Sequence, residues 1–270
     1  MLKFVVMSDL HIVPEGDVSA GLDTAGRFEC AVKDINRHHA DADFCVLAGD
    51  LADHGDAESY ERLKELMKPL SVPTYITLGN HDDRNVYLDV FGRGEMAEDA
   101  FLNHAIDVKG YRVIVLDSSE PGVPGGVLCE NRLDWLEARL AEAIGRPVII
   151  VLHHHANDLH LPVDTIKLDR AEAFVDVVKT HPDVRQVIAG HVHLATSGYW
   201  QGIPFTTLAG GHYSVSVHLP GMSGAQARLE GPGQYAVVLA DKESVLVHFH
   251  NFIDRHLVMA KALFGKKKSS

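Results

Sequence analysis

The chain has 270 residues, of which 46% are hydrophobic and 23% are charged, and its formal net charge is −12. This is the composition of an ordinary soluble protein, and the acidic balance argues against binding to nucleic-acid polymers or to membranes. No apolar run approaches the roughly 18 residues of a membrane span, and the short N-terminal apolar stretch leads directly into Asp9 and His11. We therefore expect neither a membrane anchor nor a signal peptide.

Cysteine usage indicates the compartment. The three cysteines, Cys30, Cys45 and Cys129, are odd in number and have no spacing typical of a metal site. Cys45 lies inside an apolar run and is expected to be a buried thiol. A reduced, cytoplasmic location follows as the expectation.

Strands and helices are predicted to alternate through residue 194. Five apolar runs have the length and composition of strands buried on both faces, and each ends abruptly in Asp, Asn or His: residues 4–11, 44–50, 74–82, 148–154 and 186–193. Helices are predicted over residues 25–39, 57–70, 130–144 and 169–180, the second of them capped by Asp56. Residues 104–117 are predicted to form a hairpin that turns at Lys109-Gly110.

The pattern changes after His193. Short runs at residues 197–200, 204–208, 213–219, 234–240 and 245–249 are typical of antiparallel strands. Residues 221–233 are predicted to be a loop, 252–264 a terminal amphipathic helix, and 266–270 a disordered tail.

Together these elements predict an α/β fold, a four-layer sandwich of two packed mixed β-sheets flanked by helices. We expect a single domain over residues 1–265, because the polar strand ends between residues 9 and 193 must converge. Residues 195–265 are expected to complete the second sheet and to add the C-terminal helix.

The polar strand ends predict a metal centre. In layered α/β folds, ligands and chemistry sit at the carboxyl ends of the strands, and here each such end supplies Asp, Asn or His. Asp9 and His11 can face the same side of an extended segment, as can His191 and His193. Oxygen and imidazole donors without thiolate suit Mn, Fe, Co or Zn at two adjacent positions.

In order, the motifs Asp-x-His, Gly-Asp, Gly-Asn-His-Asp, His and Gly-His-x-His resemble the calcineurin-like metallophosphoesterase family over residues 9–193. The stretches GNHDD at 79–83, VLDSS at 115–119, WLEARL at 135–140 and VLHH at 151–154 are most similar to its small bacterial branch. That branch contains glycerophosphodiesterases and class III cyclic-nucleotide phosphodiesterases.

The resemblance implies a binuclear site. One metal ion would be held by Asp9, His11 and His193 and the other by Asn80, His153 and His191, with Asp50 bridging the two. His81 would contact the substrate phosphate and assist the leaving group, so His81 and Asp50 are the residues expected to take part in catalysis. A metal-bound hydroxide would attack a small phosphodiester, either a glycerophosphodiester or a 3′,5′-cyclic nucleotide.

Several roles stay open at this stage. Asp82 could orient His81 or serve as a turn residue, and Asp82-Asp83 could cap a helix that begins near Arg84. Many family members have a proline after the paired histidines, where this chain has His155 and Ala156. His154 is expected to support a ligand and not to be one, and His212 could line the pocket.

Function also has alternatives. A phosphomonoesterase of the same family is the second hypothesis, and a nonenzymatic metal-bound scaffold is the third. A homo-oligomer, a dimer or larger, is expected from the predicted terminal helix and from apolar strands beyond the needs of the metal core. The branch that this chain resembles also tends to form such assemblies.

Overall fold

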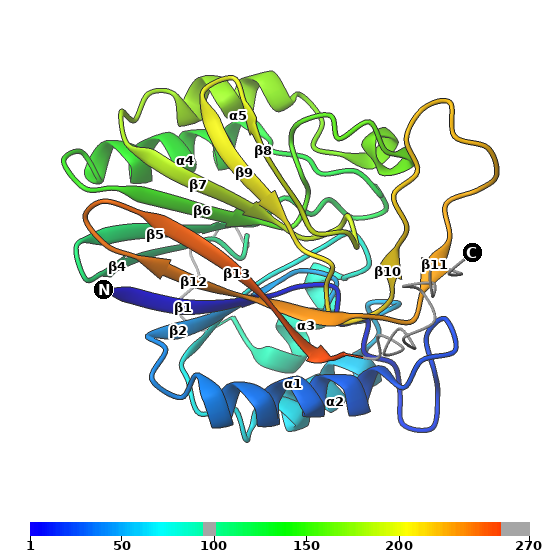
Figure 1. The fold of residues 1–270 in the computed structure, drawn as a ribbon. Coiled ribbons are helices and arrows are strands. Elements are labelled where there is room, and N and C mark those ends of the chain that lie inside the picture. Colours follow the sequence, from blue (N-terminus) through cyan, green and yellow to red (C-terminus); the bar gives the residue numbers. More distant parts are fainter. Residues whose placement is uncertain (94–100, 255–270) are drawn as a thin grey trace, which may run out of the picture.

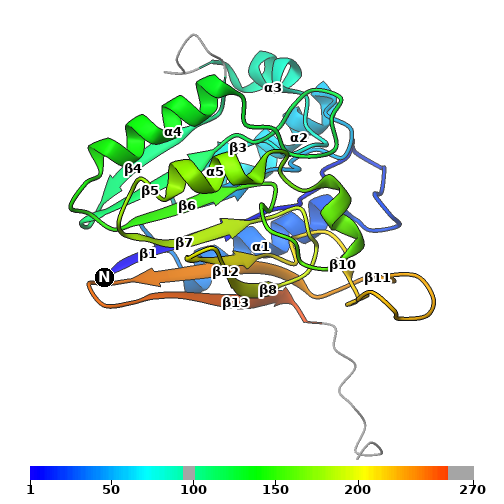
Figure 2. The same cartoon turned by 90° about the horizontal axis from the view of Figure 1, so that it is seen from above.

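The computed structural model describes residues 1–93 and 101–254. Two β-sheets pack face to face, with helices on both outer faces (Figures 1 and 2). The first sheet has the strand order β13-β12-β1-β2-β3, built from Val245–Ile253, Gly233–Ala240, Leu2–Met7, Phe44–Ala48 and Thr74–Thr77. The second has the order β4-β5-β6-β7-β9-β8, built from His104–Val108, Tyr111–Leu116, Val148–Leu152, Val184–Ala189, Ile203–Thr207 and Thr196–Trp200. The prediction of two mixed sheets is confirmed.

Helices form the two outer layers. Three of them cover the first sheet: α1 (Thr24–His38), α2 (Ala57–Met67) and α3 (Arg84–Phe91). Helices α4 (Glu130–Glu142) and α5 (Ala171–Val178) cover the second, and a short 3-10 helix, η1 (Pro162–Ile166), precedes α5. Asp23, Asp56 and Asp83 cap α1, α2 and α3 by accepting hydrogen bonds from backbone N–H groups of the first turns.

Three hydrophobic cores separate the four layers. In β1, Val5 and Met7 pack towards the helices of the first sheet, whereas Phe4 and Val6 belong to the core between the two sheets. Successive side chains of a strand point to opposite faces, so a strand covered on both sides must be apolar at nearly every position. This explains the continuous apolar runs of the sequence, and the four-layer sandwich is confirmed.

The hairpin of residues 104–117 forms as predicted. Strands β4 and β5 pair antiparallel, with Val108 opposite Tyr111. Lys109 and Gly110 between them both have positive φ, 47° and 85°. Two such residues are what a tight two-residue hairpin of strongly twisted strands requires.

The region after His193 differs from the expectation in several ways. Strand β9 lies parallel to β7, because the β8–β9 hairpin folds back and places β9 between β7 and β8. The expected strand 213–219 is reduced to β10 (Ser214–Val215), which pairs with β11 (Arg228–Leu229) inside the expected loop. Residues 195–265 were expected to complete the second sheet, but β8 and β9 join that sheet while β12 and β13 join the first.

The predicted terminal helix is wrong at its start. Phe252 and Ile253 lie in β13, where the chain continues to pair with β12 as far as Gly233. The remainder of that predicted helix and the predicted tail 266–270 lie outside the described residues. Within residues 1–93 and 101–254, no helix has the length and apolar character needed to cross a membrane.

Candidate metal centre

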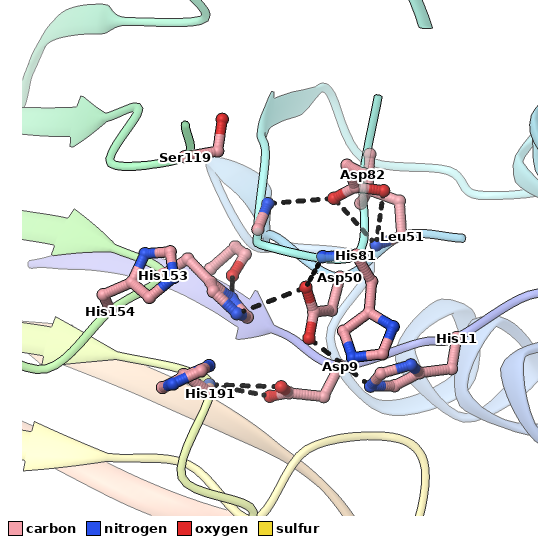
Figure 3. A network of polar contacts seen from close by, with 12 residues as sticks. Asp9, His11, Asp50, Leu51, His81, Asp82, Ser119, His153, His154 and His191 are labelled. Atoms are coloured by element: carbon pink, nitrogen blue, oxygen red, sulfur yellow. Dashed lines mark hydrogen bonds and ion pairs between the residues drawn. The ribbon is translucent and has the colours of Figure 1, made fainter. Parts of the chain in front are cut away.

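The five polar strand ends meet at one edge of the sandwich. Strands β1, β2 and β3 run parallel in the first sheet, and β6 and β7 run parallel in the second, so their carboxyl ends lie together. Figure 3 shows Asp9, His11, Asp50, His81, His153 and His191 pointing towards a common centre. The structure therefore brings together side chains that are up to 184 positions apart in the sequence.

Backbone strain is concentrated at this edge. Ten non-glycine residues of the described chain have positive φ, and five of them are predicted ligands: Asp9, His11, Asp50, His191 and His193. Such a conformation is uncommon for residues other than glycine and persists where the surrounding structure enforces it. Each of these strands thus ends in a sharp turn that aims its carboxylate or imidazole at the centre.

Two glycines allow the turns to approach one another. Gly49 has a φ of +86°, in the left-handed region that favours glycine. Gly79 is needed for a different reason, because a Cβ there would lie 2.2 Å from Oδ1 of Asp50. The close approach of the segments after β2 and β3 therefore depends on the missing side chain of Gly79.

One group of donors comprises Asp9, His11 and His193, whose ligand atoms all lie within 4.8 Å of one another. Nε2 of His193 is 3.5 Å from Oδ1 of Asp9, and the rings of His11 and His193 are 5.4 Å apart. All three residues are buried. This is the set that the sequence predicts for the first metal ion.

Asp50 lies between the donors predicted for the two ions. Its Oδ2 is 3.5 Å from Nε2 of His11, and its Oδ1 is 3.3 Å from Nε2 of His153. The backbone N–H of His81 donates to Oδ1 at 3.0 Å. The two oxygens of one buried carboxylate thus face opposite sides of the site, as a bridging ligand must.

On the other side, His153 and His191 come together with their rings 5.1 Å apart. Their ligand atoms form a group with His154, also within 4.8 Å. Asn80 lines the same cavity as Asp50 and His191, and its Oδ1 is buried and has no hydrogen-bond partner among the described residues. His154 thus lies closer to the donor set than the sequence predicts, although its Nδ1 is engaged with Oγ of Ser118 at 2.9 Å.

Hydrogen bonds from the distal ring nitrogens fix the orientation of the histidines. Each of four imidazoles uses one nitrogen to bond an oxygen outside the centre: His11 to Asp53, His153 to Ala48, His191 to Ile166 and His193 to Tyr213. Such bonds set the tautomer and leave the other nitrogen free to bind a cation. For His11 and His153 that other nitrogen, Nε2, is buried and has no hydrogen-bond partner.

Buried polar atoms without hydrogen-bond partners indicate whether cations would fit the predicted metal centre. His11 Nε2, Asn80 Oδ1 and His153 Nε2 are all buried polar atoms without a hydrogen-bond partner among the described residues, and burying such groups without a partner is costly. Two fully buried carboxylates, those of Asp9 and Asp50, add negative charge. A pair of divalent cations would satisfy the orphaned atoms and the charge together.

Burial and the charges of neighbouring groups shift the pKa values of the predicted ligands. Burial lowers the pKa of His191, the nearby His153 lowers it further, and the imidazole is therefore neutral. Burial alone raises the pKa of Asp50, but the imidazoles of His153 and His11 outweigh it, so the pKa lies well below its usual range. Burial lowers the pKa of His153, yet the carboxylate of Asp50 raises it to about 9. A cation that binds here would take the place of the His153 proton.

The family of this protein follows from a match between its sequence and a family model. A model of the family described as calcineurin-like phosphoesterase matches residues 2–195. The chain belongs to this family.

Several relatives are similar over most of their length. A probable cyclic nucleotide phosphodiesterase of Rhodopseudomonas palustris is 33% identical over 93% of this chain and 93% of its own. The 3′,5′-cyclic adenosine monophosphate phosphodiesterase CpdA of Pseudomonas aeruginosa is 32% identical over 70% of this chain and 68% of its own. A probable glycerophosphodiester phosphodiesterase, GpdQ of Arcobacter nitrofigilis, is 28% identical over 90% and 91%.

Among solved structures, a dimetal phosphatase from Danio rerio superposes with a TM-score of 0.71. Its sequence is 16% identical, and the match covers 94% of this chain and 97% of that one. At this identity the likeness concerns the fold, and it agrees with the two-sheet sandwich described above.

His81 is not one of the predicted ligands, although it lies beside them: one of its ring nitrogens is within 4.8 Å of ligand atoms of His11 and Asp50. Its Nδ1 contacts the backbone carbonyl of Asp53 at 2.7 Å, and its ring lies 4.6 Å from that of His11. Asp82 does not orient His81: its carboxylate accepts from the backbone of Gly79, Leu51 and Ala52 and from the Tyr60 hydroxyl. Asp82 is therefore the turn residue of the two alternatives, and Asp83 caps α3.

The remaining histidines also have defined contacts. Nε2 of His155 lies 3.2 Å from Oδ1 of Asp164, which links the end of β6 to η1. His212 is buried, contacts the carbonyl of Ser19 through Nε2 at 3.1 Å, and lies 4.6 Å from the His11 ring. His155 and His212 therefore stabilise the segments that carry the predicted ligands.

Sequence reasoning missed two kinds of residue. Asp53 lies three positions beyond Asp50 and bonds His11 Nδ1 at 2.8 Å, a contact that no strand-end motif indicates. Tyr213 and Arg228 line the pocket beside the donors, together with Val163 and Ile166 of η1. No sequence pattern in the segments that carry them marks individual positions.

Proposed function

We propose that this protein is a phosphodiesterase that hydrolyses small phosphodiesters, glycerophosphodiesters or 3′,5′-cyclic nucleotides, at a centre of two divalent cations. The observation that carries the proposal is the position of Asp50, whose two oxygens face His11 on one side and His153 on the other. The names of the three relatives support the diester class, since each is a phosphodiesterase or a probable one.

Under this proposal Asp9, His11 and His193 hold one cation, Asn80, His153 and His191 hold the other, and Asp50 joins them. When bound, two divalent cations neutralise an anionic diester and lower the pKa of coordinated water towards ~7. The imidazole and oxygen donors suit Mn, Fe, Co or Zn.

His81 would act on the leaving group. Its Nδ1 is held by the carbonyl of Asp53, so in the imidazolium form the second proton is on Nε2. The ring borders the same pocket as Asp50 and Asn80. Nε2 would give its proton to the departing alkoxide, which leaves poorly as an anion.

Two further parts of the proposal concern the cellular compartment and the oligomeric state. A cytoplasmic location is proposed from cysteine usage, with Cys30, Cys45 and Cys129 all present as free thiols. A homo-oligomer is proposed as well, and its test is given in the Discussion.

Turnover after metal exchange tests the function. The protein is stripped with a chelator, reloaded in turn with Mn, Fe, Co or Zn, and assayed with bis(4-nitrophenyl) phosphate, 4-nitrophenyl phosphate, a glycerophosphodiester and 3′,5′-cyclic AMP. We expect metal-dependent turnover and a higher kcat/KM for the chromogenic diester than for the monoester. A preference for the monoester would assign the protein to the phosphomonoesterases, and no turnover with any metal would favour the nonenzymatic scaffold.

A further inference from the structure

A cavity of about 250 Å³ opens beside the predicted metal centre. One side is formed by predicted ligands and His81. Apart from Val192, the rest of the lining comes from η1 and from the β10–β11 hairpin with its flanking residues, and it forms a wall of Val163, Ile166, Tyr213, Val215, Gln226 and Arg228. The wall has no part in binding the cations, so it is where the organic group of a substrate would lie.

The hairpin is fixed relative to the donors. Nδ1 of His193 contacts the carbonyl of Tyr213 at 2.8 Å, and the backbone N–H of Val215 donates to the carbonyl of His193 at 2.9 Å. The rings of His193 and Tyr213 are stacked, with centroids 4.2 Å apart and an interplanar angle of 6°. The base of the hairpin is thus tied to a predicted metal ligand by two hydrogen bonds and a ring contact.

Arg228 presents a free guanidinium on this wall. It lies opposite Val215 in the β10–β11 ladder, and both residues line the cavity. Its Cζ is 4.7 Å from the centroid of the Tyr213 ring. Within residues 1–93 and 101–254, its side chain has no ion pair and no hydrogen bond, although the chain has a net charge of −12.

Gln226 adds an acceptor. Its Nε2 donates to the carbonyl of Ser216 at 3.0 Å, which directs the amide and leaves Oε1 available. The wall therefore offers one planar donor group and one amide acceptor among apolar side chains, those of Val163, Ile166 and Val215. A nucleobase has this chemistry, with apolar faces and an edge of acceptors and amino donors.

Other organic groups fit less well. A second phosphate would call for more than one cationic side chain, and Arg228 is the only arginine or lysine in this wall of the described chain. The hydroxyls of a glycerol group would leave Val163, Ile166 and Val215 without apolar contacts. A guanidinium, in contrast, can donate to N7 and O6 of guanine, or to N7 of adenine while Oε1 of Gln226 accepts from the adenine amino group.

We propose that Arg228 is a specificity-determining residue that selects diesters carrying a purine base, by donating hydrogen bonds to the edge of the base beside Gln226. The inference rests on the proposed function, since it assigns the organic group of a diester whose phosphate lies at the metal centre. It distinguishes between the two candidate substrate classes and favours the 3′,5′-cyclic nucleotide.

The test compares Arg228→Met, Arg228→Lys and the control Arg37→Met in the metal-loaded protein. Methionine keeps an unbranched stem but removes the guanidinium, and Arg37 is exposed in the last turn of α1. Each protein is assayed with 3′,5′-cyclic AMP and with methyl 4-nitrophenyl phosphate, which has no base. We expect Arg228→Met to lose about tenfold or more in kcat/KM for the cyclic nucleotide, chiefly through KM.

The same variant should hydrolyse methyl 4-nitrophenyl phosphate as the wild type does, and Arg37→Met should match the wild type on both substrates. Arg228→Lys should recover only part of the loss, because lysine restores the charge but not the planar donor group. Unchanged cyclic-nucleotide kinetics in Arg228→Met, an equal loss on both substrates, or full recovery by lysine would each overturn the assignment.

If the proposed function is wrong, the same assays give a different result. The wild type would then hydrolyse neither diester with any of the candidate metals, and the assignment of Arg228 would fall with it. A wild type that hydrolyses the methyl ester and glycerophosphodiesters but not cyclic nucleotides would overturn the base-binding role alone.

Discussion

His81 occupies the boundary between the buried donors and the open cavity. Its side chain is 41% exposed, whereas those of His11, Asp50 and His153 are at most 3% exposed. Its contact with Asp50 is made by the backbone N–H, which a substitution of the side chain leaves in place. The residue can therefore reach a substrate without being needed to hold a cation.

We expect His81→Ala to keep both metal ions and to lose activity according to the leaving group. General acid catalysis contributes typically ~10²–10⁴-fold, so hydrolysis of a diester with an alkoxide leaving group should fall on that scale. Loss of 4-nitrophenolate should be affected less, because this group needs little help from an acid. Steady-state rates with the two kinds of diester provide the measurement.

His248→Ala is the control, since this histidine is exposed on β13. Equal losses for good and poor leaving groups in His81→Ala would show that His81 positions the phosphate and is not the acid.

At the residue scale, the sequence predicts the donors but not the residues that orient them. Asp9, Asp50, Asn80 and His153 are identifiable because each follows a strand-like apolar run. Asp53 is not, because its role depends on His11, which is 42 positions away. Arg228 is missed for a similar reason, since it reaches the site only through the pairing of β10 with β11.

At the element scale, the site depends on how closely the segments after β2 and β3 approach. A methyl group on Gly79 would lie 2.2 Å from Oδ1 and 2.4 Å from the backbone nitrogen of Asp50. Neither the backbone nor the hydrogen-bonded carboxylate can move without disturbing the donors. The glycine is thus a packing requirement of the two strand ends.

We expect Gly79→Ala to lower the free energy of unfolding of the metal-free protein by about 1–3 kcal/mol, the usual cost of an overpacked site. Denaturant unfolding measures this change. Gly211→Ala is the matched control, since a Cβ at that position meets its nearest neighbour at an ordinary 3.4 Å. Equal stability of the two variants would contradict the close approach inferred here.

The elements themselves were predictable to different degrees. The strands β1, β2 and β6 were predictable because both of their faces are buried, which leaves a continuous apolar signature. The β10–β11 hairpin was not, because its two-residue strands pair with each other and with no larger sheet. In Figure 1 it extends beyond the sandwich, so no core imposes an apolar pattern on it.

At the scale of the whole molecule, apolar side chains remain exposed on the same hairpin. Val217, Leu219, Met222 and Leu229 are each 43–51% exposed in the described structure. We expect a homo-oligomer in which this surface is covered, because clustered exposed apolar groups mark interaction sites. Sedimentation at micromolar concentration should give a mass above the 29.6 kDa of one chain, and Met222→Lys should lower it. A 29.6 kDa species alone in the wild type would contradict the prediction.

The strand ends of the two sheets converge on one site, which we propose holds two cations. The metal content of the purified protein is the decisive measurement, made by elemental analysis after loading with Mn or Zn and removal of the excess. We expect two ions per chain in the wild type, a loss of binding at both positions in Asp50→Ala, and the weakening chiefly of one position in His11→Ala. A wild-type content of one ion, or an Asp50→Ala variant that still binds two, would contradict the bridging position of Asp50 and with it the binuclear centre.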